Sequence, residues 1–224
     1  NPHNSSPMEL PALSLLETRV LGVLIEKQHT VPDSYPLTLN ALLSGCNQKT
    51  SRDPVLDATE AEVSAAIDRL KGLDLVVESS GGRVMRYAQN LARVLGIPAQ
   101  SVALLTMIML RGPQTVGELR IHTERLHRFA DISSVEGFLH ELAARPAGAL
   151  VVELTRLPGA RETRWAHLLS GVPAVATTAV AECPESDMVT VSEIVTLKAN
   201  VTQLQQELAE VRAVVERMAR ELGI

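Results

Sequence analysis

Apolar residues follow a helical period and then a strand period, and this order occurs twice along the chain. Two triplets with i, i+4, i+7 spacing each make one apolar stripe of a helix: Val63, Ile67 and Leu70, and later Val135, Leu139 and Leu142. Each stripe is followed by Leu-Val-Val-Glu and then by Arg-x-x-Arg, an aromatic residue and Ala-x-x-Leu, at residues 75–91 and again at 150–169. The duplication predicts two copies of one helix-and-hairpin module.

Each copy is predicted to be a winged helix, the helix-turn-helix variant with three helices and a β-hairpin. Thr38 and Thr115 are expected to open the second helices, and Gly-bearing turns are expected to close the hairpins. The third helices are expected to begin at Ser/Thr-x-x-Glu capping boxes, Thr59 with Glu62 and Ser133 with Glu136. The fold class is therefore mainly α with small β-hairpins.

A second pattern fills the end of the chain. Apolar residues there alternate spacings of three and four, as the a and d positions of four heptads do: Ile194, Leu197, Val201, Leu204, Leu208, Val211, Val215, Met218 and Leu222. The β-branched a positions favour a parallel homodimer through this coiled coil, with the winged modules as an additional candidate contact. The alternative is that the helix packs back on its own module.

These patterns divide the chain into five predicted parts. They are a disordered N-terminus (1–11), winged-helix domains over 12–91 and 92–171, a linker (172–188) and a coiled-coil helix (189–224).

Composition narrows the class of protein. Hydrophobic residues make up 46% of the 224 residues but aromatic residues only 2%, so aliphatic side chains must fill the cores and base stacking on aromatic platforms is not expected. Cys46 and Cys183 lack the paired spacing of a disulfide framework or a zinc site. No apolar run is long enough to span a membrane, and no leader peptide is evident, so we expect a cytoplasmic protein.

Charge is unevenly distributed around a net of −5. Residues 12–91 carry 8 Lys/Arg against 10 Asp/Glu, residues 92–171 carry 9 against 7, and residues 172–224 carry 4 against 8. A domain that binds DNA chiefly through phosphates is normally clearly basic. Neither module is, so any DNA contact has to come from a few local positions.

Three segments resemble the signature segments of the bacterial YceH-like family: Asn47 to Val55, Glu124 to Asp131, and Pro158 to Gly171. The resemblance covers about residues 12–171 and implies a tandem winged-helix fold in a cytosolic bacterial protein. Trp165 stands where a tyrosine is common in the family. The family is one of unknown function, so the resemblance carries over no catalytic or ligand-binding residues.

The basic candidates for DNA contact lie in the hairpins and in one loop. Strand parity places Arg86 and Arg164 opposite the inward aromatic residues Tyr87 and Trp165. The full candidate set is Lys49, Arg52, Arg83, Arg86, Arg156, Arg161 and Arg164. Such arginines can clamp phosphate or enter a minor groove; alternatively, they solubilise the exposed side of a small sheet.

The exposed side chains of the third helices are poorly suited to recognise DNA bases. Their expected exposed positions include Glu60, Ser64, Asp68 and Arg69 in the first module and Glu136, His140 and Glu141 in the second. Guanine is read by Arg or Lys and adenine by Asn or Gln, whereas carboxylates are repelled by phosphates.

A dense polar cluster, residues 120–131, follows the second helix of the second module. His122 and His127 are five residues apart and so lie on different sides of a helix, which argues against a metal site. We expect Leu126 and Phe129 to anchor this segment and Glu124 to pair with Arg128. The segment is also a candidate docking face.

No catalytic motif is present in the sequence, so we expect no enzymatic activity and no cofactor. The leading functional hypothesis is a DNA-associated regulatory protein, with double-stranded DNA and a second copy of the chain as partners. The rival is a protein–protein adaptor of the chromosome-segregation accessory type, which would use its winged helices as docking surfaces for an unidentified protein. The acidic third helices favour the rival, and the recurrent hairpin arginines favour the leader.

Overall fold

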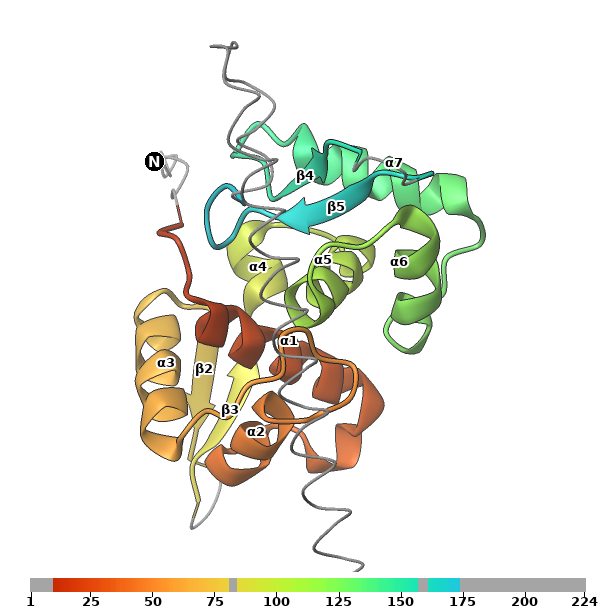
Figure 1. Ribbon diagram of the computed structural model, residues 1–224. Coiled ribbons are helices and arrows are strands. Elements are labelled where there is room, and N and C mark those ends of the chain that lie inside the picture. Colours follow the sequence, from red (N-terminus) through yellow and green to blue (C-terminus); the bar gives the residue numbers. More distant parts are fainter. Residues whose placement is uncertain (1–9, 81–83, 157–160, 174–224) are drawn as a thin grey trace, which may run out of the picture. The chain divides into compact units, whose positions relative to one another are not determined.

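Residues 10–80, 84–156 and 161–173 are described by a computed structural model of the chain, which is mainly helical with two small antiparallel sheets (Figure 1). The first half contains α1 (Leu15–Thr30), η1 (Pro32–Ser34), β1 (Leu37–Thr38), α2 (Leu39–Cys46), α3 (Glu60–Gly72), β2 (Val76–Ser79) and β3 (Arg86–Gln89). After α4 (Leu91–Leu95), the second half contains α5 (Ala99–Arg111), α6 (Val116–His122), η2 (Thr123–Arg125), α7 (Ile132–Ala143), β4 (Val151–Leu154) and β5 (Arg164–His167). The repeated order of three helices and a hairpin is compatible with winged-helix modules.

The helix starts follow from capping side chains at all but one of the expected positions. Thr38 caps α2, and Thr59 with Glu62 forms the expected capping box of α3. The box predicted at Ser133 is wrong: Asp131 is the N-cap of α7, and its Oδ1 accepts from the backbone N of Ser134 at 2.7 Å. Aspartate is as good an N-cap as serine, and here it starts the helix two residues earlier.

The two hairpins place their aromatic residues at equivalent positions. Tyr87 on β3 pairs with Glu78 on one side and Leu37 on the other, in a sheet ordered β1-β3-β2. Trp165 on β5 likewise pairs with Glu153 on β4 and with an isolated bridge at Gln114. The repeat seen in the sequence is therefore also a repeat of strand register.

Burial of the two aromatic residues is not equal, although we expected both to be buried. Trp165 is 3% exposed, whereas Tyr87 is half-buried. Met85 lies two residues before Tyr87, so strand parity predicts it on the same face, but it precedes β3 and is 40% exposed. The first sheet therefore covers its core less completely than the second.

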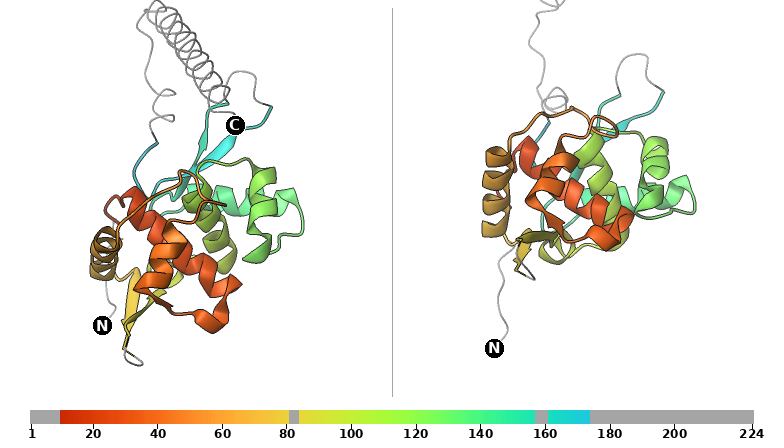
Figure 2. Two further views of the ribbon diagram at one scale, coloured as in Figure 1. Left: turned by 60° about the horizontal axis from the view of Figure 1, so that its bottom comes forward. Right: turned by 90° about the horizontal axis from the view of Figure 1, so that it is seen from below.

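The two modules share an interface that the sequence analysis did not anticipate. Helices α1 and α5 lie side by side in both views (Figure 2), and each is buried around most of its circumference. Gly22 of α1 permits the close approach, since a Cβ there would lie 2.8 Å from Leu110 Cδ2 of α5. The interface also includes backbone hydrogen bonds from Asp53 N to Leu110 O at 2.9 Å and from Leu13 N to Leu169 O at 2.8 Å.

Several predicted features lie outside the described residues: the first residues of the N-terminus, the hairpin tips with Arg83, most of the linker and the coiled-coil helix. Among the described helices, none is long and apolar enough to cross a membrane.

Candidate functional site

Two hairpin arginines, Arg86 and Arg164, are exposed but bonded to their own modules. Arg86 Nη1 donates to Pro36 O at 2.8 Å, and Arg164 Nη1 donates to Pro113 O at 2.9 Å. Each proline lies two residues before the threonine that caps the second helix. The pair therefore has one structural role, to tie the second hairpin strand to the start of that helix. Arg164 Nη2 also lies 3.4 Å from Glu118 Oε1.

Arg52 is wrong as a candidate for DNA contact. Its side chain is fully buried and forms a two-pronged pair with Glu26, at 3.2 Å from Nη1 to Oε1 and 2.6 Å from Nη2 to Oε2. Its Nε donates to Gly45 O at 3.2 Å. Burial alone would raise the pKa of Glu26, but the hydrogen bonds and charge of Arg52 hold that pKa below its usual value.

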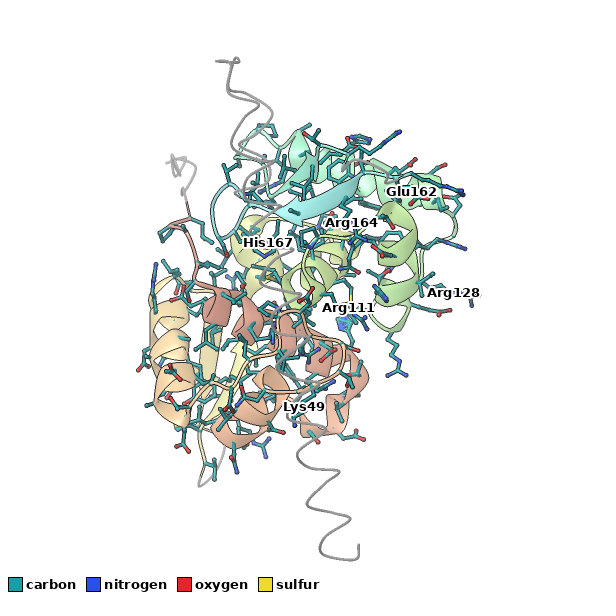
Figure 3. The ribbon with its side chains drawn as sticks, viewed as in Figure 1. Lys49, Arg111, Arg128, Glu162, Arg164 and His167 are labelled. Carbon is teal, nitrogen blue, oxygen red and sulfur yellow. The ribbon has the colours of Figure 1, made fainter. Side chains whose placement is uncertain are left out.

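The other basic candidates are exposed. Lys49, Arg156 and Arg161 face solvent, and no salt bridge involves them among the described residues. Figure 3 shows Lys49 on the first module. They are the described candidates for nucleic-acid contact whose side chains are exposed and not bonded to another described residue, and Arg83 lies outside the described part of the chain.

The third helices expose the carboxylates that the sequence placed on them. Glu60 and Asp68 are exposed on α3, and Glu136 and Glu141 on α7. The one basic side chain of this set, Arg69, is drawn to Glu17 Oε1 at 3.3 Å. Reading of the major groove by either helix is therefore disfavoured electrostatically.

A polar cleft of about 350 Å³ opens between the two modules. Its walls are the C-terminal half of α1, the α2–α3 loop, the end of α5 and the α6–η2 segment. A second hollow of about 240 Å³ adjoins it, and three residues line both: Ser51, Arg111 and His122. Figure 3 shows Arg111 at this boundary between the modules and Arg128 farther out on the second module.

Arg111 is held in the cleft by neutral partners. Its Nη2 donates to Ser51 Oγ at 2.7 Å, and its Nη1 lies 3.3 Å from His122 Nε2. Gln114 Nε2 donates to Met107 O at 2.9 Å, which leaves Gln114 Oε1 as the acceptor for His122 Nδ1–H at 2.5 Å. His122 is thus a neutral imidazole whose Nε2 lone pair accepts from Arg111.

The electrostatics of the cleft agree with that tautomer. Burial, and then the charge of Arg111, lowers the pKa of His122. An imidazolium would set a second positive charge against the guanidinium and lose the acceptor. The hydrogen-bond chain from α5 through Gln114 and His122 therefore orients Arg111 without neutralising it.

The α2–α3 loop that carries Ser51 is held by buried groups. Arg19 is completely buried in α1 and donates to Cys46 O, at the end of α2, at 3.2 Å and to Pro54 O, within the loop, at 2.6 Å. Ser51 itself has a positive φ of 59°, a conformation that costs energy for a residue with a Cβ. The contacts of Arg19 fix the loop that forms one wall of the cleft.

Neither a reactive thiol nor a cluster of metal-ligating side chains is found in the described part of the chain. Burial raises the pKa of the Cys46 thiol to about 12, which leaves it protonated and unreactive. Among the described residues, no group of three or more His, Cys, Asp or Glu side chains is placed to hold a metal ion. What the cleft offers is a fixed, half-buried cation with hydrogen-bond donors.

The segment 120–131 contributes to this cleft rather than forming a site of its own. Phe129 is buried and Leu126 half-buried, as expected. The expected i, i+4 pair between Glu124 and Arg128 is not formed, because η2 ends at Arg125 and the two residues do not share a helix.

Arg111 was missed at the level of sequence, although a signal existed. It is the single charged residue at the end of the apolar run of α5, immediately before Gly112 and Pro113. A charge in that position lies at the edge of a buried helix, where it meets whatever packs against the helix end. Predicting its partners requires the packing of α1 on α5.

The comparisons with known proteins agree on one family. The family model described as a protein of unknown function, DUF480, matches residues 13–160. A UPF0502 protein of Dechloromonas aromatica is 59% identical over 211 residues, covering 94% of this chain and 98% of the relative. UPF0502 proteins of Methylibium petroleiphilum and Burkholderia thailandensis are 61% and 62% identical, covering 96% and 95% of this chain and 92% and 90% of the relatives.

Proposed function

Since the chain belongs to the DUF480 family of unknown function, which corresponds to the YceH-like family, we propose its role from its own surface: a non-enzymatic tandem winged-helix protein that associates with DNA as a regulator. The observation that carries this proposal is the exposed arginine pair of the second hairpin, Arg156 and Arg161. Neither has an ion-pair partner among the described residues. This hairpin belongs to the module with more basic than acidic residues.

The mode of contact follows from the charges around the pair. Carboxylates on α3 and α7 oppose insertion of either helix into the major groove, so contact is with the phosphate backbone from the hairpin side. Such contact carries little sequence information and depends steeply on salt, because each neutralised phosphate releases counterions. Two chains joined in a dimer would present two such hairpins and gain affinity by avidity.

The test compares the full chain with the double variant Arg156→Ala/Arg161→Ala on duplexes of different sequence. We expect the variant to weaken binding to a similar degree on every duplex. Its salt slope should fall by about two for each bound chain, because two phosphates per chain are no longer neutralised. A charge-matched control, Arg93→Ala/Arg128→Ala, removes two exposed arginines outside the hairpin and should keep the slope. Failure of the full chain to bind any duplex at low salt would rule the proposal out.

The adaptor is the second candidate, and the exposed carboxylates of the third helices favour it. Glu60 is the first residue of α3, and Glu136 lies one turn into α7; both are exposed. A partner that binds through these faces should no longer bind Glu60→Lys/Glu136→Lys and should still bind Arg156→Ala/Arg161→Ala. The opposite pattern with DNA as the ligand would support the regulator.

A further inference from the structure

The cleft between the modules has an excess of positive charge on its walls. Its lining residues include three cations, Lys27, Arg111 and Arg125, against two carboxylates, Glu26 and Glu124. The charge of Glu26 is already matched from behind by buried Arg52 at 2.6 Å, and Lys27 Nζ lies 3.3 Å from the same carboxylate. Glu124 lies on the exposed part of the wall.

Arg111 is a half-buried cation of the cleft, and most of its hydrogen-bond donors have no partner in the described part of the chain. Its guanidinium has five N–H groups, of which one bonds to Ser51 and one to His122. No carboxylate among the described residues lies within ion-pair distance of it. The side chain is half-buried, so water screens its charge less than on an open surface.

Two neutral residues of the first module, Thr30 and Gln48, also line the cleft. Their donors are bonded within that module, Thr30 Oγ1 to Glu26 O at 2.9 Å and Gln48 Nε2 to Thr50 O at 3.0 Å, and Gln48 Oε1 lies 3.4 Å from Lys27 Nζ.

Of the charged residues that line the second hollow, Arg52 is paired with Glu26 and Arg164 with Glu118, which leaves Arg111 and Asp53 with opposite charges. The excess of positive charge therefore belongs to the first hollow.

We infer that this cleft binds a phosphate group of a small molecule, with Arg111 as its principal ligand and Lys27 as a second cation from the other module. A guanidinium presents paired N–H donors that match two oxygens of a phosphate, and it is oriented before binding by the Gln114–His122 chain. A volume of about 350 Å³ lies in the range of small-molecule sites and favours a compact metabolite over a polymer. Because the ligand would touch both modules, its binding would stabilise their mutual packing.

The experiment uses the full-length chain and inorganic pyrophosphate, with sodium chloride at matched ionic strength as the reference. At about a hundredfold excess over Kd, we expect the melting temperature to rise by about 5–10 °C. Isothermal titration should give a single site per chain. Arg111→Gln should weaken binding at least about tenfold, because it removes charge-assisted bonds, while Arg93→Gln, an exposed arginine of α4, should bind as the parent does.

Arg111→Lys and Lys27→Gln keep the test decisive if Arg111→Gln does not fold. Arg111→Lys keeps the charge without the paired donors, so it should bind more weakly than the parent. Lys27→Gln should also lose affinity. Equal stabilisation by citrate would overturn the assignment to phosphate, and the absence of heat and of a thermal shift with pyrophosphate would overturn the site. Neither result bears on the hairpin arginines, because the DNA assay uses different variants.

Discussion

His167, at the end of β5, is half-buried and carries a titratable ring. Its Nδ1 is inaccessible to solvent and has no hydrogen-bond partner among the described residues. Burial lowers the pKa of His167 to about 4, since a charged ring would keep a buried N–H without an acceptor. The neutral ring is thus part of the folded state.

The pH dependence of stability follows from that shift. In the unfolded chain the ring titrates near its ordinary pKa of about 6.5. Below this pH the unfolded state therefore binds a proton that the folded state does not bind. The contribution of His167 is complete above about pH 6.5 and is lost progressively down to about pH 4, a total of about 3 kcal/mol. Urea unfolding at a series of pH values should show a shallower acid loss for His167→Phe.

The control for that series is His29→Gln, an exposed histidine of α1, which should leave the acid loss unchanged. Some acid sensitivity should persist in His167→Phe, because the pKa of His122 is also lowered. An acid loss as steep in His167→Phe as in the parent would mean that another group controls the transition.

At the scale of elements, local patterns in the sequence predicted most of the helix starts correctly. The capping residues Thr38, Thr59 and Thr115 start the helices where the patterns put them, because each satisfies backbone donors within its own turn. The start of α7 was placed wrongly, since Asp131 and Ser133 both qualify as caps and local chemistry alone does not choose between them. Unequal burial of Tyr87 and Trp165 depends on neighbouring elements and was beyond local patterns.

The candidate site was less accessible to prediction. Exposure of Lys49, Arg156 and Arg161 agrees with their polarity, but the burial of Arg52 depends on Glu26, which is 26 residues away. The carbonyl bonds of the hairpin arginines depend on folding the strand back over the second helix. Because bonds of this kind join segments far apart in the chain, residue spacing in the sequence does not predict them.

The unequal burial of the hairpin aromatic residues can be measured. Trp165 is 3% exposed and lies edge-on to His140, with ring centroids 5.3 Å apart. Trp165→Ala should cost roughly 3–5 kcal/mol, as for a core aromatic residue. Tyr87→Ala should cost less, roughly 1–3 kcal/mol, because the half-buried Tyr87 side chain packs less completely against its neighbours. Chemical unfolding of both variants checks this, and equal costs would contradict the difference in burial.

At the scale of the whole molecule, the α1–α5 interface should make the two modules unfold together. A Cβ at Gly22 would lie 2.8 Å from the side chain of Leu110, which is 1% exposed and has little room to move. Gly22→Ala should therefore destabilise by about 1–3 kcal/mol, although alanine is the better helix former. Gly137→Ala in α7 meets nothing within 4 Å and should instead stabilise by about 0.5–1 kcal/mol.

Two probes can follow that coupling. Trp165 is the only tryptophan in the chain and reports on the second module, whereas circular dichroism reports on the helices of both. The two melting curves should coincide in the parent and separate in Gly22→Ala. Curves that are already separate in the parent would show that the shared interface does not couple the modules.

The heptad pattern of residues 189–224, which lie outside the described residues, predicts assembly beyond one chain. A helix from about residue 189 to 222 would be roughly 50 Å long at 1.5 Å per residue, and a small module cannot cover so long and narrow a seam. A second copy covers every a and d residue through an isologous contact. Leu204→Asp with Leu208→Asp puts carboxylates in the seam, and light scattering should then report a folded monomer. Gln203→Asp with Gln206→Asp adds the same charge outside the seam and should stay dimeric; a dimer in both variants would assign the contact to the modules.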